Sequence, residues 1–486
     1  MRSDPSFARN DPSLVPVLAA AALFGLAVLT ALGSPAAAGA MALAAGAAFV
    51  LWAAWRVQGD GAHLLCALVM IELLCSATVL PVTEEQRFII RYPLLLLFCA
   101  PAAIGSLRNP MLWRGGFRDY MLYLGWGAVS ITYSLLPGYS LARVTAAILI
   151  FVVSVRIATE MKDRRGMERL FKWFLAGLGA VWIGLAATLL TAPHELAWSA
   201  EELSAMERFR GFFSSPNQVG EAMLATVAAA AVVWNSASRR QRIWIALEAA
   251  AAIAMAAMAD SRSPFVGLAV GASAYLLWRY RWRAVPLCLA AAVLMFAAAA
   301  RIAPHYFTRG EVSTLTGRTD VWKFALAQIG ERPLLGWGFE VEGQILQSRY
   351  FPLWWGPWEE GPHSSLHNGY LSRAVGVGVP AFAFWMFFFI RPWLWALRRK
   401  EDSWRLKRMF LLVVVPVLIL NMVETTAGDC RYAVGLLVTL CWAFAERQRL
   451  ECRGAKHQQH QLFSFCASPF LPLPDRGDGW GSRLET

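Results

Sequence analysis

Long apolar blocks recur along this chain, and short polar segments separate them. Each block is about twenty residues long, the length that crosses the hydrocarbon core of a bilayer as an α-helix. The blocks lie near 14–33, 36–55, 62–81, 88–105, 119–136, 140–157, 170–191, 217–234, 242–259, 264–279, 284–300, 370–390, 408–424 and 431–446. The pattern predicts an all-α polytopic membrane protein with about 12–14 transmembrane helices.

The polar segments between these blocks set the domain organisation. We expect a cytoplasmic N-terminus at 1–13, transmembrane helices 1–11 within 14–300, one large loop at 301–366, helices 12–14 within 367–446 and a disordered cytoplasmic tail at 447–486. The loop between the eleventh and twelfth helices is far longer than an ordinary connection. Because it is dense in Trp, Phe, Leu and Pro, we predict that it folds and carries function.

Basic residues orient the predicted helices. Counted from a cytoplasmic N-terminus, they cluster in inner loops, near 56, 108–118, 156–169, 239–242, 279–283 and 391–408. The short outer loops hold only Arg87, Arg143, Arg262 and Arg431. This is the positive-inside distribution. Basic residues in the inner loops face the anionic inner surface of the membrane, and this explains the formal net charge of +12. We therefore expect no nucleic-acid partner.

That orientation brings three polar segments, far apart in the sequence, to the outer face. They are the large loop at 301–366, the segment 192–216 after the seventh helix, and the turn 260–263 after the ninth. We expect a functional site where they meet.

Arg318 is the first candidate residue. Thr319 or Asp320 can cap a helix that ends near Gly330. Its apolar face is predicted to hold Val321, Trp322, Ala325, Leu326 and Ile329. An arginine beside a helix N-terminus offers a forked cation and free N–H groups to a phosphate. The alternative is an exposed arginine paired with Asp320 or Glu331.

His367 is the candidate proton acceptor. It lies just before the twelfth helix, at the predicted membrane boundary. A histidine can be neutral near pH 7 and can then take a proton from a hydroxyl group. Asn368 beside it can orient the ring or a substrate hydroxyl, and His363 is a competing base on the same loop. The alternative is an interfacial histidine that hydrogen-bonds only to backbone.

The other outer segments supply further candidates. Arg262 stands in a very short turn between apolar blocks, where an arginine is costly unless it is paired. It is therefore a candidate site residue, or else simply the partner of Asp260. Candidates for substrate binding are Arg208, Arg210, Asn217, Glu359 and Glu360.

Metal-binding patterns are missing from the sequence. The outer segments contain no DxD pair, and the eight cysteines show neither a CxxC pair nor a Cys/His metal spacing. We therefore predict that the protein uses no metal and no cofactor.

Four short motifs follow one another along the second half of the chain. They are SRS at 261–263, GRTDVW at 317–322, PLLGWGFE at 333–340 and HNGYL at 367–371, with RFRGFFSSPN at 208–217 upstream. In this order they resemble the bacterial O-antigen ligase and O-antigen or exopolysaccharide polymerase superfamily, over residues 205–390. One departure is Arg373, where the resemblance would place an acidic or neutral residue.

The resemblance implies a multi-pass glycosyltransferase of the bacterial inner membrane, with loop 301–366 in the periplasm. It implies transfer of a glycan from an undecaprenyl-diphosphate donor to a lipid A core or a growing glycan. Arg262, Arg318 and His367 match the residues regarded as essential in that family. We interpret the two arginines as stabilising the departing diphosphate without metal, and His367 as the base. Direct displacement predicts inversion at the anomeric carbon.

Two alternatives stay open. A polysaccharide polymerase acting on lipid-linked repeat units would use the same residues, and the sequence does not separate it from a ligase. A transporter or flippase for lipid-linked oligosaccharides belongs to another class. Such proteins place polar sites near the bilayer midplane and often contain repeats, whereas here the polar groups gather at the outer edge and no repeat is visible.

Overall fold

The structure is a computed structural model. It describes residues 96, 99–100, 103–160, 164–191, 194–200, 207–213, 215–291, 293, 318–350, 365–398, 404–425 and 433–466. The first three predicted helices and the site candidates His363, Glu359 and Glu360 lie outside the described residues.

The described chain is almost entirely helical. The main helices are α5 (Gly115–Ser130), α6 (Pro137–Glu160), α7 (Arg164–Thr191), α9 (Pro216–Val233), α10 (Arg239–Met258), α11 (Arg262–Tyr280), α14 (Arg318–Glu331), α17 (Gly369–Arg398), α18 (Trp404–Met409), α19 (Val415–Leu420) and α20 (Ala433–Cys466). Shorter elements are α8 (His194–Ala197), α15 (Glu342–Ile345), and strands β1 (Trp198–Ala200) and β2 (Glu207–Phe209). Single turns of 3-10 or π-helix lie at Pro110–Trp113, Trp234–Ser236, Arg281–Ala284, Leu346–Tyr350 and Phe410–Val414.

Length and hydropathy confirm the predicted class of an all-α membrane protein. Within the described part of the chain, five helices are long and apolar enough to cross a bilayer. They are Pro137–Glu160, Gly166–Leu190, Pro216–Ser236, Arg239–Met258 and Gly369–Arg398. The total number of spans and their orientation stay predictions.

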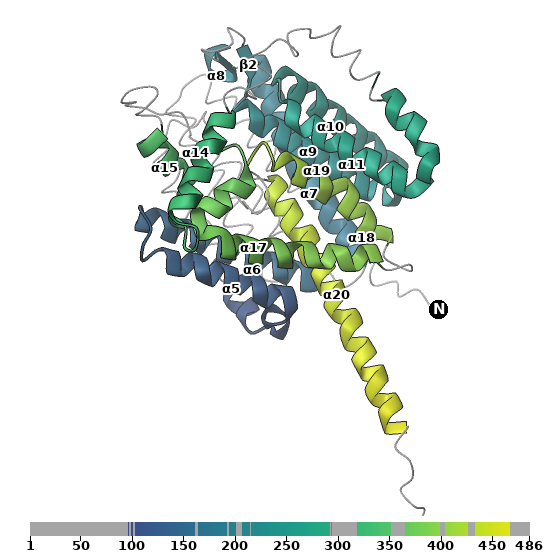
Figure 1. Ribbon diagram of the computed structural model, residues 1–486. Coiled ribbons are helices and arrows are strands. Elements are labelled where there is room, and N and C mark those ends of the chain that lie inside the picture. The colour runs from purple at the N-terminus through teal and green to yellow at the C-terminus, as the bar shows by residue number, and fades with distance from the viewer. Residues whose placement is uncertain are drawn as a thin grey trace, which may run out of the picture.

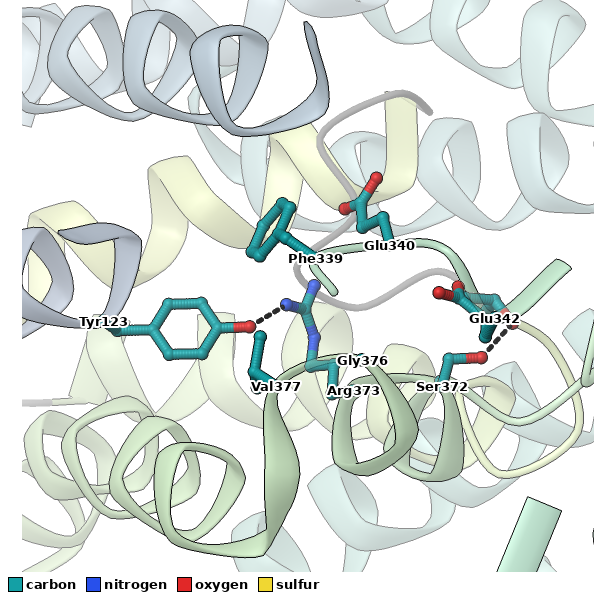
Figure 2. Close-up of a pocket in the computed structure, with 10 residues that line it drawn as sticks. Tyr123, Phe339, Glu340, Glu342, Ser372, Arg373, Gly376 and Val377 are labelled. Carbon is teal, nitrogen blue, oxygen red and sulfur yellow. Dashed lines mark hydrogen bonds between the residues drawn. The ribbon is translucent and has the colours of Figure 1, made fainter. Parts of the chain in front are cut away.

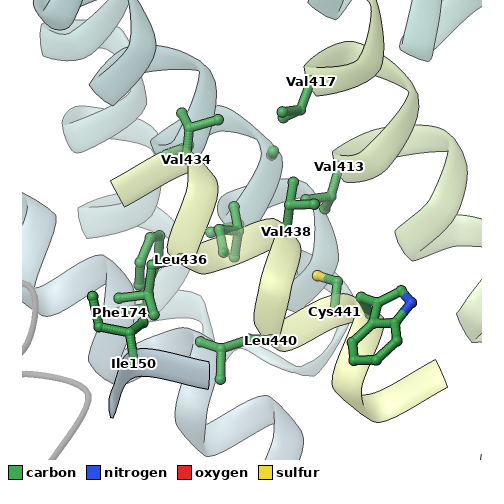
Figure 3. Packing of buried hydrophobic residues seen from close by; sticks show 14 of the residues in the cluster. Ile150, Phe174, Val413, Val417, Val434, Leu436, Val438, Leu440 and Cys441 are labelled. Atoms are coloured by element: carbon green, nitrogen blue, oxygen red, sulfur yellow. The ribbon is translucent and has the colours of Figure 1, made fainter. Parts of the chain in front are cut away.

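The helices form two groups joined by α20. Figure 1 shows α7, α9, α10 and α11 in one group and α5, α6 and α17 in the other. Helix α20 contacts α6, α9 and α17, and its C-terminal half extends away from both groups (Figure 1). Apolar side chains of α20, including Val434 and Leu440, lie between Val417 of α19 and Ile150 of α6 (Figure 3). This packing fixes both groups relative to the end of α19.

Residues 318–350, which fall within the predicted large loop, form α14 and α15 and supply most of a second, smaller apolar cluster. The cluster comprises Ala325, Trp337, Val341, Ile345, Leu346, Leu366 and Val375. Ala325 is the buried centre of the face predicted for α14, whereas Leu326 is 58% exposed. The prediction that Leu326 belongs to that face is wrong, because α14 packs against α17 and the following turn through a narrower stripe than its apolar residues suggest.

An interruption in α17 holds this segment in place. Gly378 has φ 81° and ψ 165°, which breaks the helix. The carbonyls of Val375 and Gly376 instead accept hydrogen bonds from the N–H groups of Trp337 (3.0 Å) and Gly338 (2.9 Å). The backbone of the PLLGWGFE motif is therefore fastened to the first half of α17, next to the HNGYL motif.

Replacing Gly378 with alanine should lower the free energy of unfolding by about 1–3 kcal/mol, because only glycine adopts this backbone conformation readily. A Cβ atom here would also lie 2.3 Å from the carbonyl oxygen of Leu334. Gly330→Ala is the matched control, since a Cβ at Gly330 meets nothing within 4 Å. Thermal unfolding in detergent measures both. Equal unfolding temperatures for the two variants would contradict the role given to Gly378.

The predicted boundary of the C-terminal tail is wrong. Helix α20 continues to Cys466, so residues 447–466 are helical. Ion pairs one turn apart support the extension: Arg449 Nε donates to Glu446 Oε2 (2.6 Å), and Arg447 Nε donates to Glu451 Oε1 (2.8 Å). Glu446 also accepts from the N–H of Gly116 at 2.6 Å. This tertiary contact is not visible in the polar composition on which the prediction rested. Residues 467–486 lie outside the described chain.

Candidate active site

One buried carboxylate, Glu424, joins three of the predicted site residues. Its Oε1 accepts hydrogen bonds from Arg318 Nη2 at 2.9 Å and from Asn217 Nδ2 at 3.0 Å. Its Oε2 lies 3.0 Å from His367 Nδ1. Only 8% of the Glu424 side chain is exposed. A carboxylate can accept about four hydrogen bonds, so one group holds an arginine, an amide and an imidazole together.

Glu424 is held by the turn that follows α19. Its backbone N–H donates to Leu420 (2.8 Å), and the N–H of Gly369 donates to the carbonyls of Asn421 (2.9 Å) and Glu424 (3.1 Å). A Cβ at Gly369 would lie 2.0 Å from Asn421 Oδ1. The glycine of the HNGYL motif therefore lets the start of α17 contact this turn directly.

His367 has a left-handed backbone conformation, with φ 47°. Its N–H donates to Ser365 Oγ at 3.1 Å. Its Nδ1 faces Glu424, whereas no described residue hydrogen-bonds to Nε2, and 36% of the side chain is exposed. The alternative of a histidine satisfied by backbone alone is therefore wrong. Glu424 holds the ring through Nδ1, and Nε2 is left for a substrate hydroxyl group.

The Asn368 side chain caps helix α17 and does not contact the His367 ring. Its Oδ1 accepts from the N–H groups of Tyr370 (3.1 Å) and Leu371 (3.0 Å), which caps α17. Its Nδ2 donates to the carbonyl of Met422 at 3.0 Å. The structure thus gives no contact through which Asn368 orients the His367 ring.

The charges around Glu424 determine its ionisation. Burial raises the pKa of this carboxyl group, but attraction to His367 and Arg318 together with their hydrogen bonds outweighs burial, so the pKa lies below its ordinary value. Glu424 is therefore negative at neutral pH. A carboxylate beside Nδ1 is placed to stabilise the positive charge that a histidine acquires when it acts as a general base.

Arg318 is the first residue of α14 and does not pair with Asp320 or Glu331. Its Nη1 donates to the carbonyl of Val423 at 2.5 Å and its Nη2 donates to Glu424. Asp320 pairs with Lys323 (2.9 Å) and Glu331 pairs with Arg349 (3.1 Å). A guanidinium has five N–H donors, so these two contacts leave Arg318 capacity for an anion.

Arg208 extends the network toward the turn between α10 and α11. Strands β1 and β2 pair antiparallel, with Ser199 opposite Arg208. The buried Arg208 side chain donates to Asn217 Oδ1 (2.9 Å) and to the carbonyls of Ala259 (2.9 Å) and Asp260 (3.2 Å). Its contacts are those of a residue that positions the strands and helices around the site.

Arg262 adjoins this network through Asp260. Its Nε lies 3.4 Å from Asp260 Oδ1, so the simple pairing considered for it does occur. Asp260 has φ 48°, and its backbone carbonyl accepts from Arg208. A continuous series of contacts therefore runs from Arg262 through Asp260, Arg208 and Asn217 to Glu424.

Arg210 lies in the turn that follows β2. Its backbone N–H donates to the carbonyl of Ala197 at 2.9 Å. Burial lowers the pKa of its guanidinium. Its assignment to substrate binding stays a prediction.

Glu424 is the residue that sequence reasoning missed. A signal was present, because it is the single carboxylate at the outer end of the apolar block 408–424. The rule that drew attention to Arg262, that an ionisable residue at a membrane edge is a functional candidate unless paired, applies equally to Glu424.

The described residues contain no group of three or more His, Cys, Asp or Glu side chains that could hold a metal ion. The site built here is instead a set of cations and one histidine around a carboxylate. Its independence of metal stays a prediction.

Comparison with known families agrees with the motifs. Residues 247–386 match the family model described as O-antigen ligase. This confirms the resemblance to the O-antigen ligase and polymerase superfamily. The match includes Arg262, Arg318 and His367 and ends before Glu424. Among curated proteins, none matches the chain.

Proposed function

We propose that this chain, which carries an O-antigen ligase domain at residues 247–386, transfers a glycan from undecaprenyl diphosphate to an acceptor sugar at the periplasmic face of the inner membrane. The observation that carries the proposal is the contact of Arg318 and His367 with one buried carboxylate, Glu424. A cation suited to a diphosphate and a base suited to a hydroxyl are thus held side by side.

The leaving group needs positive charge. As the bond between the anomeric carbon and the diphosphate oxygen breaks, its electron pair stays on the diphosphate. Arg318 keeps N–H donors for these oxygens, and Arg262 lies at the other end of the same network. Cations that are already in place stabilise the developing charge without reorganisation.

The nucleophile needs a base. The acceptor hydroxyl gives its proton to His367 Nε2 while its oxygen forms the new bond to the anomeric carbon. Glu424 then stabilises the imidazolium through Nδ1. Attack opposite the departing diphosphate inverts the anomeric configuration. A ligase uses a lipid A core as the acceptor, and a polymerase uses another repeat unit.

Purified protein in nanodiscs, supplied with a lipid-linked glycan and an acceptor saccharide, tests the proposal. We expect a new glycosidic product and free undecaprenyl diphosphate. Movement of the donor across the bilayer without any product would instead favour the flippase. In cells, deletion should leave lipid-linked polymer unattached to lipid A if the protein is a ligase, or single repeat units on the acceptor if it is a polymerase.

Turnover should survive an excess of EDTA, because arginines take the place that a divalent metal holds in many sugar-nucleotide enzymes. The rate of product formation, measured before and after chelation and again after Mg²⁺ is added, checks this. Complete loss with EDTA and recovery with Mg²⁺ would contradict the arginine-based mechanism.

A further inference from the structure

Residues 365–368 form a short irregular segment just before α17, and this segment carries His367. Helix α17 is fixed separately, because Arg373 Nη1 donates to the hydroxyl group of Tyr123, on α5, at 2.7 Å. Figure 2 shows the Arg373 side chain pointing toward Tyr123. The direction in which the His367 side chain leaves the backbone therefore depends on the hydrogen bonds of the segment itself.

One peptide group sets that direction. It links Leu366 to His367, and both of its polar atoms are held. The carbonyl oxygen accepts a hydrogen bond from Trp322 Nε1 at 3.0 Å, and the N–H donates to Ser365 Oγ at 3.1 Å. The orientation of this peptide plane determines the φ angle of His367, which is 47°, a left-handed value that residues other than glycine seldom adopt. Such a conformation persists only where the surrounding contacts determine it.

Trp322 connects this peptide group to the helix of Arg318. The two residues lie four positions apart on α14, so their side chains are neighbours on one face of the helix. Arg318 contacts the turn after α19, through the carbonyl of Val423 and the carboxylate of Glu424. Trp322 contacts the segment that carries His367. One face of α14 thus holds both the carboxylate and the histidine that meet in the site.

The N–H side of the same peptide group is tied to that turn. Ser365 Oγ, which accepts from the N–H of His367, lies 3.2 Å from Thr425 Oγ1. Thr425 directly follows Glu424 in the chain. The peptide group ahead of His367 is therefore held between α14 and the turn that carries the partner of the imidazole ring.

Apolar packing does not account for Trp322. The sequence predicts it on the apolar face of α14, together with Val321, Ala325 and Ile329. These three residues belong to the smaller apolar cluster or pack against it, whereas neither cluster of the described chain includes Trp322. Its contact is instead the hydrogen bond to Leu366, whose side chain does lie in the smaller cluster and is 1% exposed. This favours a role in orienting the backbone over a role in the core.

We infer that Trp322 is a positioning residue for the proposed base: its indole N–H fixes the peptide group ahead of His367 and so keeps the ring against Glu424. The inference rests on the proposed glycan transfer. A displacement of about 1 Å in a catalytic group can cost about 10²-fold in rate. The contacts of Arg318 do not pass through Trp322, so loss of the indole N–H should slow the chemical step and leave donor binding intact.

Removal of the indole N–H tests the inference. In the nanodisc assay, Trp322→Phe should lower the single-turnover rate per folded protein by about tenfold and leave donor Kd unchanged. Benzothienylalanine at position 322, which keeps the double ring and replaces the N–H with sulfur, should have the same effect. Trp126→Phe is the matched control, because Trp126 Nε1 donates to the carbonyl of Val377 at 3.1 Å, at the interruption of α17. Its transfer rate should not change.

The His367→Ala background separates positioning from a purely structural role. A tryptophan that acts only through His367 cannot slow a protein that lacks the imidazole, so Trp322→Phe should cause no further loss there. An equal fall in both backgrounds, an unchanged rate in the folded variants at position 322, or a weakened donor Kd would each overturn the inference while glycan transfer stands. Absence of transfer by the unmodified protein would instead refute the proposed function itself.

Discussion

Arg318→Ala should lower the transfer rate by about 10²–10³-fold, the loss typical of removing one preorganised donor to a developing negative charge. Donor binding should weaken as well, because the diphosphate is charged before and after the bond breaks. The variant also leaves Glu424 with fewer donors, since Arg318 supplies one of its hydrogen bonds. Single-turnover rates and donor Kd, measured with the same lipid-linked substrate, separate the two effects.

Two further variants sharpen this prediction. Arg318→Lys should recover only part of the rate, because an ammonium is a point charge and cannot contact the carboxylate and a phosphate with a planar fork. Lys323→Ala is the control. Lys323 lies on the same helix, α14, and its exposed side chain pairs with Asp320, so its loss should have little effect. Full activity of Arg318→Ala would remove this arginine from the mechanism.

The positions of the long apolar helices can be predicted from the sequence because bilayer thickness constrains their length. Helix α9 is predicted at 217–234 and occupies Pro216–Val233, and α11 is predicted at 264–279 and occupies Arg262–Tyr280. Helix ends that depend on tertiary contacts are harder to predict from the sequence. Helix α17 passes its predicted end at residue 390 and continues to Arg398, and α20 continues to Cys466.

Part of the candidate site could also be predicted from the sequence, because the membrane constrains where charged residues lie. Positive-inside reasoning placed the segments of Arg208, Arg318 and His367 on one face, and the structure joins these residues through hydrogen bonds. The residue at their centre was missed. Glu424 is 57 residues from His367 and 106 from Arg318 along the chain, and nothing local in the sequence reports contacts over such separations.

The attachment of the GWGFE segment to α17 could not be predicted from the sequence, for a different reason. It depends on a backbone event, the break in α17 at Gly378, and on hydrogen bonds between the freed carbonyls and the GWGFE segment. The sequence showed Arg373 only as a departure from the expected pattern. Once Glu340 and Glu342 are placed beside it, its charge has an evident physical reason.

His367→Ala should lower the transfer rate by about 10²–10⁴-fold, the usual contribution of a general base, and should leave donor Kd near its original value. Arg318→Ala should lower the transfer rate and also weaken donor binding, so donor Kd should distinguish the two variants. His363→Ala should be mild, and so should His194→Ala, the control, because His194 is exposed and pairs with Glu207 on the β1–β2 hairpin. If His363→Ala abolishes transfer and His367→Ala retains it, the base has been misassigned.

Glu424→Gln completes the test of the base, because it keeps the shape of the side chain and removes its charge. The imidazolium that forms on His367 then loses the carboxylate at its Nδ1. The transfer rate per folded protein should therefore fall, because the positive charge that develops on the ring is no longer stabilised. A residue with a purely structural role would lower the amount of folded protein and leave the rate per folded protein unchanged. If both His367→Ala and Glu424→Gln remain fully active, proton transfer by this pair is refuted, and departure of the diphosphate on Arg318 and Arg262 must supply the catalysis.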